Sequence, residues 1–406
     1  MIEMVLRRAF TDALASLRLA PRVRDALGPA PPAGRVTVVA VGKSAAPMLE
    51  GLLQAWPDRA DTVLVARPER SVPPSGATLA RCEDFAGGHP LPARSAVRAW
   101  ERLCLALEGG RPEDTVVVLL SGGASASLCA PRPGLTLRDL QRRCEALLRA
   151  GLPIEALNRA RGGLDLAKHG GLLRRAAPAQ VRTLASADIL GDDVSVMHTL
   201  GGAPTVHFQP LPLAPEVNAR IASVLGPWGW EHSLPPEPPE ASQTYTILVR
   251  PSDARDTLVA KLTEGGLRVT LGGTATGAVE TLAEAYLRDF KTVAPGEARV
   301  LVGEPTVTLP EGELGVGGRA GRLSLLVSRG LTGQRGVAFL AAGTDGVDGA
   351  SPHAGAVVTG ASWEETGADA LARYDDAPWH GRRGTAVVTG PTGLNLLDLH
   401  VLARAA

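Results

Sequence analysis

Two aspartates, three residues apart, follow a strongly apolar stretch of the sequence. Residues 336–342 read GVAFLAA, which predicts a buried strand, and the continuation GTDGVDGAS places Asp345 and Asp348 among glycines. Carboxylates at this spacing suit Mg²⁺, a cation that takes one or two carboxylates together with substrate phosphates. One of the pair could instead accept a proton from a reacting hydroxyl group. Capping of a turn or helix is the plainer alternative.

A second acidic cluster, ADILGDD at residues 187–193, follows another predicted strand. It contains Asp188, Asp192 and Asp193, and the same interpretations apply: a metal or proton-accepting role, or capping of the next helix. We take Asp192 and Asp348 as the candidate Mg²⁺ ligands of the two clusters.

Two cations could serve the same chemistry. Lys43 lies in VGKSAAPM, directly after a predicted strand, where it would face either a ligand crevice or water. Arg319 follows Gly317 and Gly318, and its planar guanidinium suits bidentate binding of an acid group, with a surface arginine on a glycine turn as the alternative. The string GKS is not a P-loop, because the upstream glycine of GxxxxGK[ST] is absent, and no GxGxxG follows the first strand. We therefore reject a GTPase-like site and find no dinucleotide fingerprint.

Five predicted strands end in short loops that contain glycine. These loops are GKSAA (42–46), SGGAS (121–125), DILGDD (188–193), GTDGVDG (343–349) and TGPTG (389–393). In open α/β sheets the carboxyl ends of the strands form the ligand crevice, and glycine lets backbone N–H groups approach an anion. Ordinary strand-to-helix turns also favour glycine, but five such junctions favour a crevice that handles phosphate or carboxylate.

A polar stripe is predicted on one helix. Asn158, Arg161, Asp165 and Lys168 are spaced at i, i+3, i+7 and i+10, so they share a face if the helix continues that far. The glycines at 162–163 weaken that helix by about 1 kcal/mol each relative to alanine. A polar stripe on a weakened helix indicates either close approach to a ligand or a solvated face.

The elements that must position these residues alternate between strands and helices. Predicted strands cover residues 35–41, 62–66, 115–120, 181–187, 245–250, 268–271, 299–302, 305–309, 336–342 and 385–389. Helical periodicity covers residues 3–19, 94–108, 136–150, 153–162, 253–264 and 277–290. Continuous apolar strands such as TVVVLL are typical of a sheet covered by helices on both faces. The sequence therefore predicts an α/β fold with largely parallel or mixed sheets.

One segment is too rich in proline for a helix or a central strand. Residues 226–243 read GPWGWEHSLPPEPPEASQ, with four prolines within five positions. We interpret it as a linker between a domain of residues 1–235 and a domain of residues 236–406. A long surface loop inside one domain is the alternative, and so is a C-terminal segment that returns to the first domain.

Composition excludes several classes of protein. The 42 basic and 42 acidic residues balance, so the chain lacks the basic excess that binds nucleic acid or an anionic membrane. No apolar run approaches the ~20 residues of a membrane span, and the N-terminus is amphipathic and carries Glu3 and Asp12, unlike a signal peptide. The four cysteines are far apart in sequence, which argues against a disulfide framework or a zinc site. We expect a cytoplasmic protein.

Taken in order, these stretches resemble the type II glycerate kinases, a family of glycerate 2-kinases that also contains proteins called hydroxypyruvate reductases. The resemblance covers nearly the whole chain. It is carried by VGKSAAPM (41–48), GGHPLP (87–92), LSGGASASLCAP (120–131), LNRARGGLDLAKHGG (157–171), ADILGDD (187–193), LGGAPT (200–205), GVGGR (315–319), GTDGVDGASPHAGAVV (343–358) and TGPTGLNLLDL (389–399).

The resemblance implies two three-layer α/β domains, the first of them Rossmann-like, around a deep inter-domain cleft. It also implies transfer of the γ-phosphoryl group of ATP, with Mg²⁺, to the 2-hydroxyl of D-glycerate or a close hydroxy acid. Lys43, Asp188, Arg319 and Asp345 match positions with functional roles in the family. The expected partners are therefore ATP and this small substrate, with no nucleic acid and no membrane, and the choice between a monomer and a homodimer stays open.

We assign the chemical roles as a hypothesis. Lys43 and Arg319 would hold the carboxylate and the transferring phosphoryl group, while Asp345 or Asp188 would orient the 2-hydroxyl or bind Mg²⁺. Further residues are expected to contact phosphate through the backbone, or the substrate; they are Ser121, Gly122, Gly123, Asn158 and Arg161. All of these residues are expected to share one pocket.

The chain departs from the family's pattern at several polar positions. The departures are Ala93, Ala187, Gly202, Ala320, Arg322, His353 and Leu394. They favour a divergent member and leave two alternatives: a binding or regulatory homologue with altered catalysis, or an NAD(P)H-dependent hydroxypyruvate reductase.

Overall fold

A computed structural model of the chain describes residues 1–152, 154–207, 213–226, 243–310 and 312–406. The chain forms two compact units, one of residues 19–248 and one that combines residues 1–18 with residues 249–406. We call them the parallel-sheet unit and the mixed-sheet unit. Most of the proline-rich segment expected to be a linker lies outside the described residues. The division differs from the predicted one at both ends of the first domain.

Helix α1 (Ile2–Ser16) belongs to the mixed-sheet unit although it begins the chain. Its apolar face is buried in that unit, where the helix packs against α12 (Pro251–Glu264) and β11 (Val337–Gly343). Arg7 donates hydrogen bonds to the backbone oxygens of Ala386, at 2.6 Å, and Gly384, at 3.0 Å. Periodicity in the sequence predicts the buried face of a helix, but not which distant element covers it.

The parallel-sheet unit is built around six strands in the order β3-β2-β1-β4-β5-β6. The strands are β1 (Val36–Val41), β2 (Thr62–Pro68), β3 (Glu83–Gly87), β4 (Thr115–Ser121), β5 (Gln180–Ser186) and β6 (Gln243–Val249). The pairs from β3 to β5 are parallel. This is the order of doubly wound folds, in which ligands bind where the order reverses, here between β1 and β4. Strand β6, predicted within the second domain, is an edge strand of this sheet.

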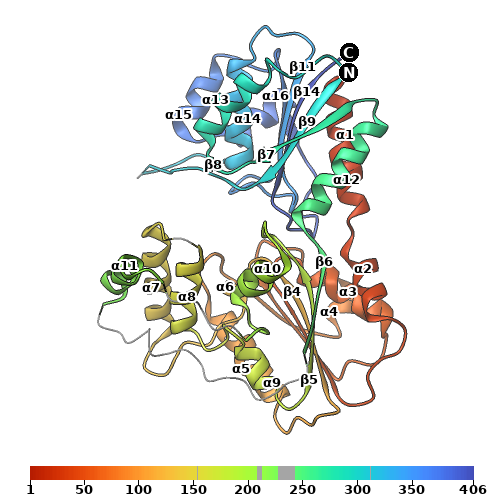
Figure 1. Ribbon diagram of the computed structural model, residues 1–406, viewed down its shortest axis with the longest axis vertical. Helices are drawn as coiled ribbons and strands as arrows, with labels where there is room; N and C mark the ends of the chain where they lie inside the picture. The colour runs from red at the N-terminus through yellow and green to blue at the C-terminus, as the bar shows by residue number, and fades with distance from the viewer. Residues whose placement is uncertain (153, 208–212, 227–242, 311) are drawn as a thin grey trace. The chain divides into compact units, whose positions relative to one another are not determined.

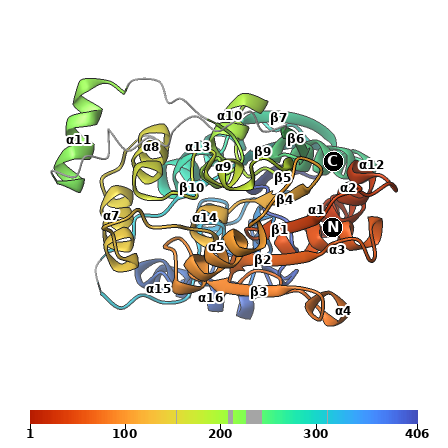
Figure 2. The ribbon, with the colours of Figure 1, turned by 90° about the horizontal axis from the view of Figure 1, so that it is seen from below.

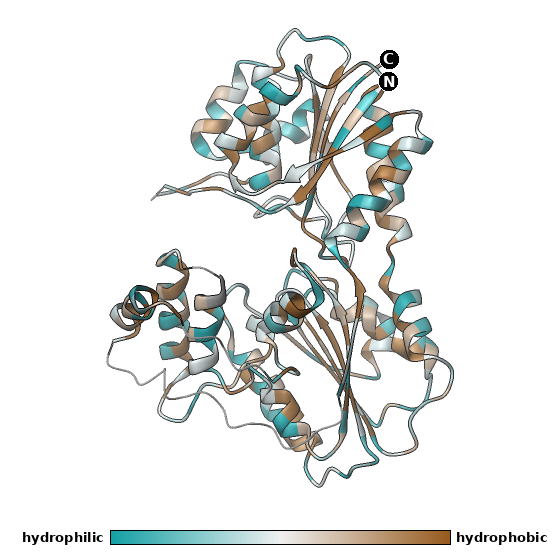
Figure 3. Ribbon diagram, in the orientation of Figure 1, coloured by the Kyte–Doolittle hydropathy of each residue, from teal (hydrophilic) through white to brown (hydrophobic). Residues whose placement is uncertain are grey.

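Helices cover both faces of this sheet (Figure 1). One face carries α2 (Leu19–Leu27) and α3 (Ala45–Ala55), and the other carries α5 (Arg94–Ala106), α6 (Ala124–Ser127) and α9 (Gly171–Ala176). Because both faces are covered, every residue of β1 and β4 is buried, and the central strands are strongly hydrophobic (Figure 3). Three further helices, α7 (Leu137–Arg149), α8 (Ile154–Leu164) and α11 (Pro215–Leu225), pack together as a helical group (Figure 2). The remaining elements are α4 (Gly76–Leu79), α10 (Asp193–Thr199) and the 3₁₀ turn η1 (Leu200–Gly202).

The mixed-sheet unit also has a six-stranded sheet, in the order β13-β12-β11-β14-β9-β7. Its strands are β7 (Arg268–Thr274), β9 (Glu297–Gly303), β11, β12 (Gly355–Thr359), β13 (Ala386–Val387) and β14 (Asp398–Arg404). Strands β8 (Gly277–Ala278) and β10 (Pro305–Thr306) form a separate two-stranded sheet. Strands β7 and β9 are parallel, and the other neighbours are antiparallel. Helices α13 (Val279–Asp289) and α14 (Arg319–Gly330) lie on one face and α1 and α12 on the other (Figure 1). Two more helices, α15 (Thr366–Arg373) and α16 (Asp376–Arg383), pack against α14.

The α/β class is confirmed, and the predicted strands are mostly present. The exceptions are residues 305–309 and 385–389, where only two residues of each form a strand. Four strands of the described residues were not predicted: β3, β8, β12 and β14. Strand β14 reads DLHVLAR, and its polar residues hide the apolar pattern although it lies in the middle of its sheet. Within the described part of the chain, no helix is both long enough and apolar enough to span a membrane.

Candidate active site

Lys43 and the glycine loop after β4 meet at the point where the strand order of the parallel-sheet unit reverses. The Lys43 backbone N–H donates to the Gly122 oxygen at 2.8 Å. A Cβ at Gly123, where φ is +82°, would lie 3.4 Å from Lys43 Cγ. Glycine at 123 therefore allows both the left-handed turn and the approach of the lysine side chain. Lys43 therefore lies beside Gly122 and Gly123, and their shared role in a site stays a prediction.

The Ser121 hydroxyl joins the two loops. Its Oγ accepts the Ser44 backbone N–H at 3.0 Å and donates to the Val41 oxygen at 3.1 Å, and it is fully buried. A Cβ at Gly42, where φ is +107°, would overlap the Ser121 backbone. Ser121 thus fixes the position of Lys43 through hydrogen bonds inside the protein.

Asp188 and His89 belong to the same edge of this sheet. In the register of β4 and β5, Ser121 pairs with Ser186, so Asp188 follows directly at the carboxyl end of the neighbouring strand. The ring of His89 approaches the loop from β3, because a Cβ at Gly123 would lie 3.4 Å from His89 Cδ2. His89 was quoted within GGHPLP but was not singled out by the sequence analysis. Its proximity to the glycine loop makes it a further candidate.

A buried ion pair holds the other end of the glycine loop. Lys168 Nζ donates to the backbone oxygens of Ser125, at 2.8 Å, and Leu128, at 2.9 Å, and lies 3.3 Å from Asp165 Oδ2. Both side chains are buried, so their charges are compensated by each other and by hydrogen bonds. Helix α8 ends at Leu164, and the stripe predicted through Lys168 is therefore wrong beyond Arg161. Asp165 and Lys168 position a loop instead.

Asn158 and Arg161 lie on α8, within the helical group, and both are half-buried. Burial raises the pKa of the Cys144 thiol, and the nearby Arg161 guanidinium partly opposes that rise. The glycine that weakens this helix has a structural reason, because a Cβ at Gly162 would overlap the ring of His169. The space that Gly162 leaves open is thus filled by the His169 ring and not by a ligand. A substrate role for Asn158 and Arg161 stays a prediction.

Asp192 caps a helix. Its Oδ1 accepts the Ser195 backbone N–H at 2.8 Å at the start of α10, which lowers the pKa of this exposed carboxyl. This is the capping role named as the alternative to Mg²⁺ binding.

In the mixed-sheet unit, Arg319 is bound by two carboxylates of the protein. Its Nε and Nη2 donate to the two oxygens of Asp398, at 2.6 and 3.0 Å, and its Nη1 donates to Glu304 at 2.5 Å. Asp398 is 2% exposed, whereas the Arg319 side chain is 32% exposed. These bonds use three of the five guanidinium N–H groups. The bidentate acid partner predicted for Arg319 is therefore Asp398 in this structure, a residue that no sequence pattern indicated.

Asp348 caps α14, the helix that begins with Arg319. Its Oδ1 accepts the Ala320 N–H at 3.1 Å, and its Oδ2 accepts the Gly321 N–H at 2.7 Å. Burial, reinforced by the negative charge of Asp398, raises the pKa of Asp348 to about 7. Both oxygens are occupied by the backbone, so Asp348 suits a structural role better than the predicted Mg²⁺ site.

A second aspartate, Asp376, lies against the same helix end. Its Oδ2 accepts the Gly318 N–H at 3.4 Å, and burial raises its pKa to about 7. A Cβ at Gly317 or Gly321 would overlap the Asp376 carboxylate, and a Cβ at Gly318 would overlap Asp348. The glycines of GVGGRAG therefore admit two acidic side chains to the start of α14.

Asp345 follows β11 and is half-buried. A Cβ at Gly343 would lie 3.1 Å from Asp345 Oδ1 and 3.3 Å from Asp398 Oδ1, so the carboxylate that orients Arg319 is close to Asp345. Gly346, with φ +84°, packs against the Gly390 backbone oxygen. The glycines around Asp345 thus bring loops 343–349 and 389–393 together.

Several departures from the family pattern are accommodated by packing. Arg322 donates from Nε to Glu280 at 3.0 Å and from Nη1 to the Leu371 oxygen at 2.9 Å. Gly202 makes room for Lys168, whose Cδ would lie 2.5 Å from a Cβ there. Leu394 is 4% exposed. These residues fit the interior of the fold, and the structure therefore gives no reason to connect them with lost catalysis.

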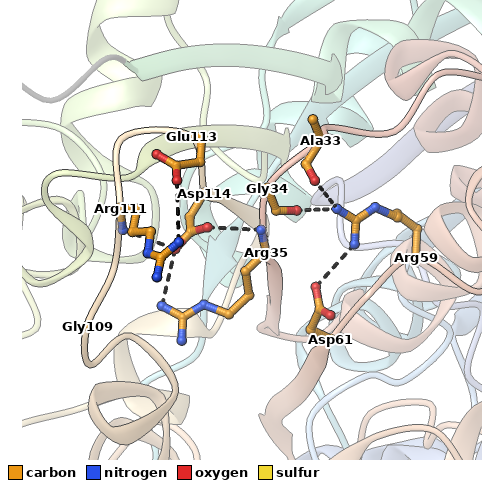
Figure 4. A pocket seen from close by; sticks show the side chains of 9 residues that line it. All are labelled: Ala33, Gly34, Arg35, Arg59, Asp61, Gly109, Arg111, Glu113 and Asp114. Carbon is orange, nitrogen blue, oxygen red and sulfur yellow. Dashed lines mark hydrogen bonds and ion pairs between the residues drawn. The ribbon is translucent and has the colours of Figure 1, made fainter.

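A cavity of about 710 Å³ in the parallel-sheet unit lies away from the strand ends just described. It is lined by residues next to the amino ends of β1, β2 and β4, and Figure 4 shows how its charged side chains pair. Arg35 contacts Asp114 at 3.4 Å, and Arg59 contacts Asp61 at 3.3 Å. Ligands of such sheets bind at the carboxyl ends, so this cavity is not the candidate active site.

Two family models match this chain. A family model described as a domain of unknown function, DUF4147, matches residues 5–214, and the MOFRL family model matches residues 298–398. A protein of Agrobacterium vitis provisionally named hydroxypyruvate reductase is 32% identical and covers 98% of this chain and 93% of its own. The D-glycerate 2-kinase of Thermotoga maritima is 28% identical over 90% of this chain and 89% of its own.

A solved structure shows the same fold. The crystal structure of glycerate kinase from Thermotoga maritima superposes with a TM-score of 0.82 at 24% identity, covering 100% of this chain and 99% of that one.

Proposed function

This chain belongs to the family that combines DUF4147 and MOFRL domains and includes glycerate kinases, and we propose that it transfers the γ-phosphoryl group of ATP to the 2-hydroxyl group of D-glycerate. It is a glycerate kinase, because proteins named glycerate kinase or glycerate 2-kinase align with it along most of its length. The observation that carries the site is the position of Lys43 beside the glycine loop where the strand order reverses.

The reaction exchanges one phosphorus–oxygen bond for another. The 2-hydroxyl oxygen bonds to the γ-phosphorus, the bond from that phosphorus to the β-phosphate oxygen breaks, and ADP leaves. The hydroxyl proton passes to a carboxylate, for which Asp345 and Asp188 are the candidates. Lys43 in the parallel-sheet unit and Arg319 in the mixed-sheet unit are each candidates to stabilise the charge of the transferring group, and charge stabilisation is most of the catalysis that phosphoryl transfer needs.

Mg²⁺ is part of the proposal. In the described part of the chain, no group of three or more His, Cys, Asp or Glu side chains is arranged to hold a metal ion. Mg²⁺ in kinases is held by one or two carboxylates plus phosphate oxygens, so a complete protein cage is not required. In the mixed-sheet unit Asp345 is the better candidate, because Asp348 accepts backbone N–H groups with both of its oxygens, whereas the Val347 N–H donates to Oδ1 of Asp345 at 3.2 Å. Bound Mg²⁺ would neutralise charge between the phosphates.

The reductase alternative has a structural argument against it. A dinucleotide would need free backbone N–H groups in the turn after β1 to bind its pyrophosphate. In that turn the Lys43 N–H donates to Gly122 and the Ser44 N–H donates to Ser121. The glycine loop after β4 therefore occupies the donors that a dinucleotide would use.

The test uses the purified full chain with D-glycerate, ATP and Mg²⁺. We expect ADP release that depends on D-glycerate, and a product whose phosphorus signal is split by one carbon-bound proton, as a 2-phosphate requires. Splitting by two protons would assign the 3-position and correct the regiochemistry. A parallel assay with hydroxypyruvate and NADH should show no oxidation of NADH. Absence of glycerate-dependent ADP release would refute the kinase proposal.

A further inference from the structure

The mixed-sheet unit contains a cavity that the proposed roles of Lys43 and Asp345 leave unexplained. Its volume is about 680 Å³, which is in the range of sites for drug-sized ligands and cofactors. Its lining comes from residues 304–307, Leu309, residues 314–315, residues 317–319, Arg322, residues 349–350, Tyr374 and Asp376. D-Glycerate has only three carbons and would leave most of this space empty.

One wall of the cavity is aromatic and rigidly held. The Arg322 guanidinium lies 4.0 Å from the centre of the Tyr374 ring, and the Tyr374 hydroxyl donates to the Thr308 backbone oxygen at 3.2 Å. Tyr374 has φ +54°, a conformation uncommon for residues other than glycine. Since Arg322 is itself bound to Glu280 and Leu371, the ring needs little ordering to receive a ligand.

A rim of the cavity is aliphatic and poorly covered. Leu309 is 61% exposed and Leu314 is 36% exposed, and the half-buried Val307 packs against the core of the unit. Exposed leucines in the lining of a hollow favour an apolar or aromatic ligand. They do not suit glycerate, which is small, charged and rich in hydroxyl groups.

The charges around the cavity are balanced. Arg319 is paired with Glu304 and Asp398, and Arg322 is paired with Glu280. At the start of α14 the buried Asp376 accepts the Gly318 N–H and Asp348 accepts the next two N–H groups, so the two carboxylates occupy donors that a phosphate would otherwise bind. A balanced cavity suits an uncharged part of a ligand better than a polyphosphate. Arg319, one third exposed, is the cation of the lining that could meet phosphate at its edge.

We propose that this cavity binds the base and ribose of the nucleotide substrate, with the base against Tyr374 and the polyphosphate extending past Arg319. The inference rests on the proposed kinase function and adds the place of the nucleoside to it. The two substrates are then held by different contacts. The nucleoside is held by apolar contact in the mixed-sheet unit, and glycerate is held by charged side chains.

The test measures binding of ADP alone to the full chain by calorimetry, and then the KM values for ATP and D-glycerate. The variant Leu309→Asp/Leu314→Asp places charge on the exposed rim, where folding is not at risk. We expect its ADP affinity to fall, and its KM for ATP to rise, by about tenfold or more, because burial of two leucine surfaces is lost. The KM for D-glycerate should change less than about twofold. The matched control Leu271→Asp, 55% exposed on β7 and outside the cavity, should leave all three values unchanged.

A second pair of variants tests the aromatic wall. Tyr374→Phe keeps the ring and loses the bond to Thr308, whereas Tyr374→Ala loses both. ADP affinity should be nearly retained in the first and reduced about tenfold in the second, since only the second loses the aromatic surface on which a base can stack. Unchanged ADP affinity in Leu309→Asp/Leu314→Asp and Tyr374→Ala, or a rise in the KM for glycerate alone, would overturn the proposal.

The two proposals can fail separately. If the natural chain phosphorylates D-glycerate but ADP binding ignores the cavity variants, the nucleoside site is wrong and the kinase function stands. If the natural chain binds ADP in a way that Leu309→Asp/Leu314→Asp abolishes, but shows no glycerate-dependent ADP release, the nucleoside site stands and the acceptor is wrong. A chain that neither binds ADP nor turns over refutes both.

Discussion

Replacing Asp398 by asparagine tests whether Arg319 is positioned for catalysis by the fold. The Asp398 carboxylate is 2% exposed and accepts two hydrogen bonds from Arg319, at 2.6 and 3.0 Å. Asparagine has nearly the same shape but only one oxygen, and its NH₂ group would face a guanidinium N–H. Asp398→Asn should therefore leave Arg319 in more than one orientation and lower turnover.

The expected size of the effect follows from the burial of the pair. Removing one partner of a fully buried ion pair costs about 3–5 kcal/mol, and losing one hydrogen bond to a charged group costs about 1.5–3 kcal/mol. Because the Arg319 side chain is 32% exposed and keeps Glu304, we expect the lower value, about 2 kcal/mol, in the stability of the mixed-sheet unit. Loss of a preorganised charge stabiliser should reduce kcat by roughly tenfold to a hundredfold.

Two measurements separate catalysis from folding. Hydrogen exchange of the β14 and α14 amides reports the local stability, and steady-state kinetics reports kcat and both KM values. The matched control is Glu304→Gln, which breaks the exposed half of the Arg319 contacts and should cost less than about 1 kcal/mol with little change in kcat. Natural turnover in Asp398→Asn, or an equal loss of kcat in Glu304→Gln, would refute the reasoning.

Three other changes have definite expected outcomes. Lys43→Ala should lower kcat by about a hundredfold, the effect of losing about 2.7 kcal/mol of charge stabilisation, and a rate close to that of the natural chain would remove Lys43 from the site. The stability of the mixed-sheet unit should decrease as pH rises from about 4 to about 7, because Asp348 and Asp376 bind protons more tightly in the folded chain, with pKa values near 7, than in the unfolded chain. Urea unfolding at several pH values measures this, and a stability that rises across that window contradicts it. Gly346→Ala should destabilise the unit by more than about 1 kcal/mol, since it adds a strained φ and an overlap with the Gly390 oxygen, and an unchanged unfolding midpoint would show that the loop adapts.

The strands that end in glycine-containing loops could be predicted from the sequence. The strands that precede Lys43, Ser121, Asp188 and Asp345 were all predicted, because a buried strand leaves a continuous apolar run that needs no knowledge of its partners. Because the strands were predicted, the position of these residues after the carboxyl ends of strands was predicted with them. The α/β class followed from the same local pattern.

The roles of the acidic residues could not be predicted from the local sequence pattern. Asp192 and Asp348 share their sequence signal with metal ligands, since an aspartate beside glycine is equally suitable for capping a helix. Only the hydrogen bonds to the backbone of α10 and α14 distinguish the two uses. The same holds for Gly162, whose missing side chain accommodates His169 and not a ligand.

The amino-acid sequence by itself determined the alternation of strands and helices and the loops at which small residues, cations and acids occur, because these depend on neighbours within a few residues. Tertiary structure decided which unit α1 joins, the order of the strands, and the partner of Arg319. Arg319 and Asp398 are 79 residues apart in sequence, and β14 carries that aspartate into the centre of a sheet. Contacts at such separations depend on how whole elements pack, and no local pattern specifies them.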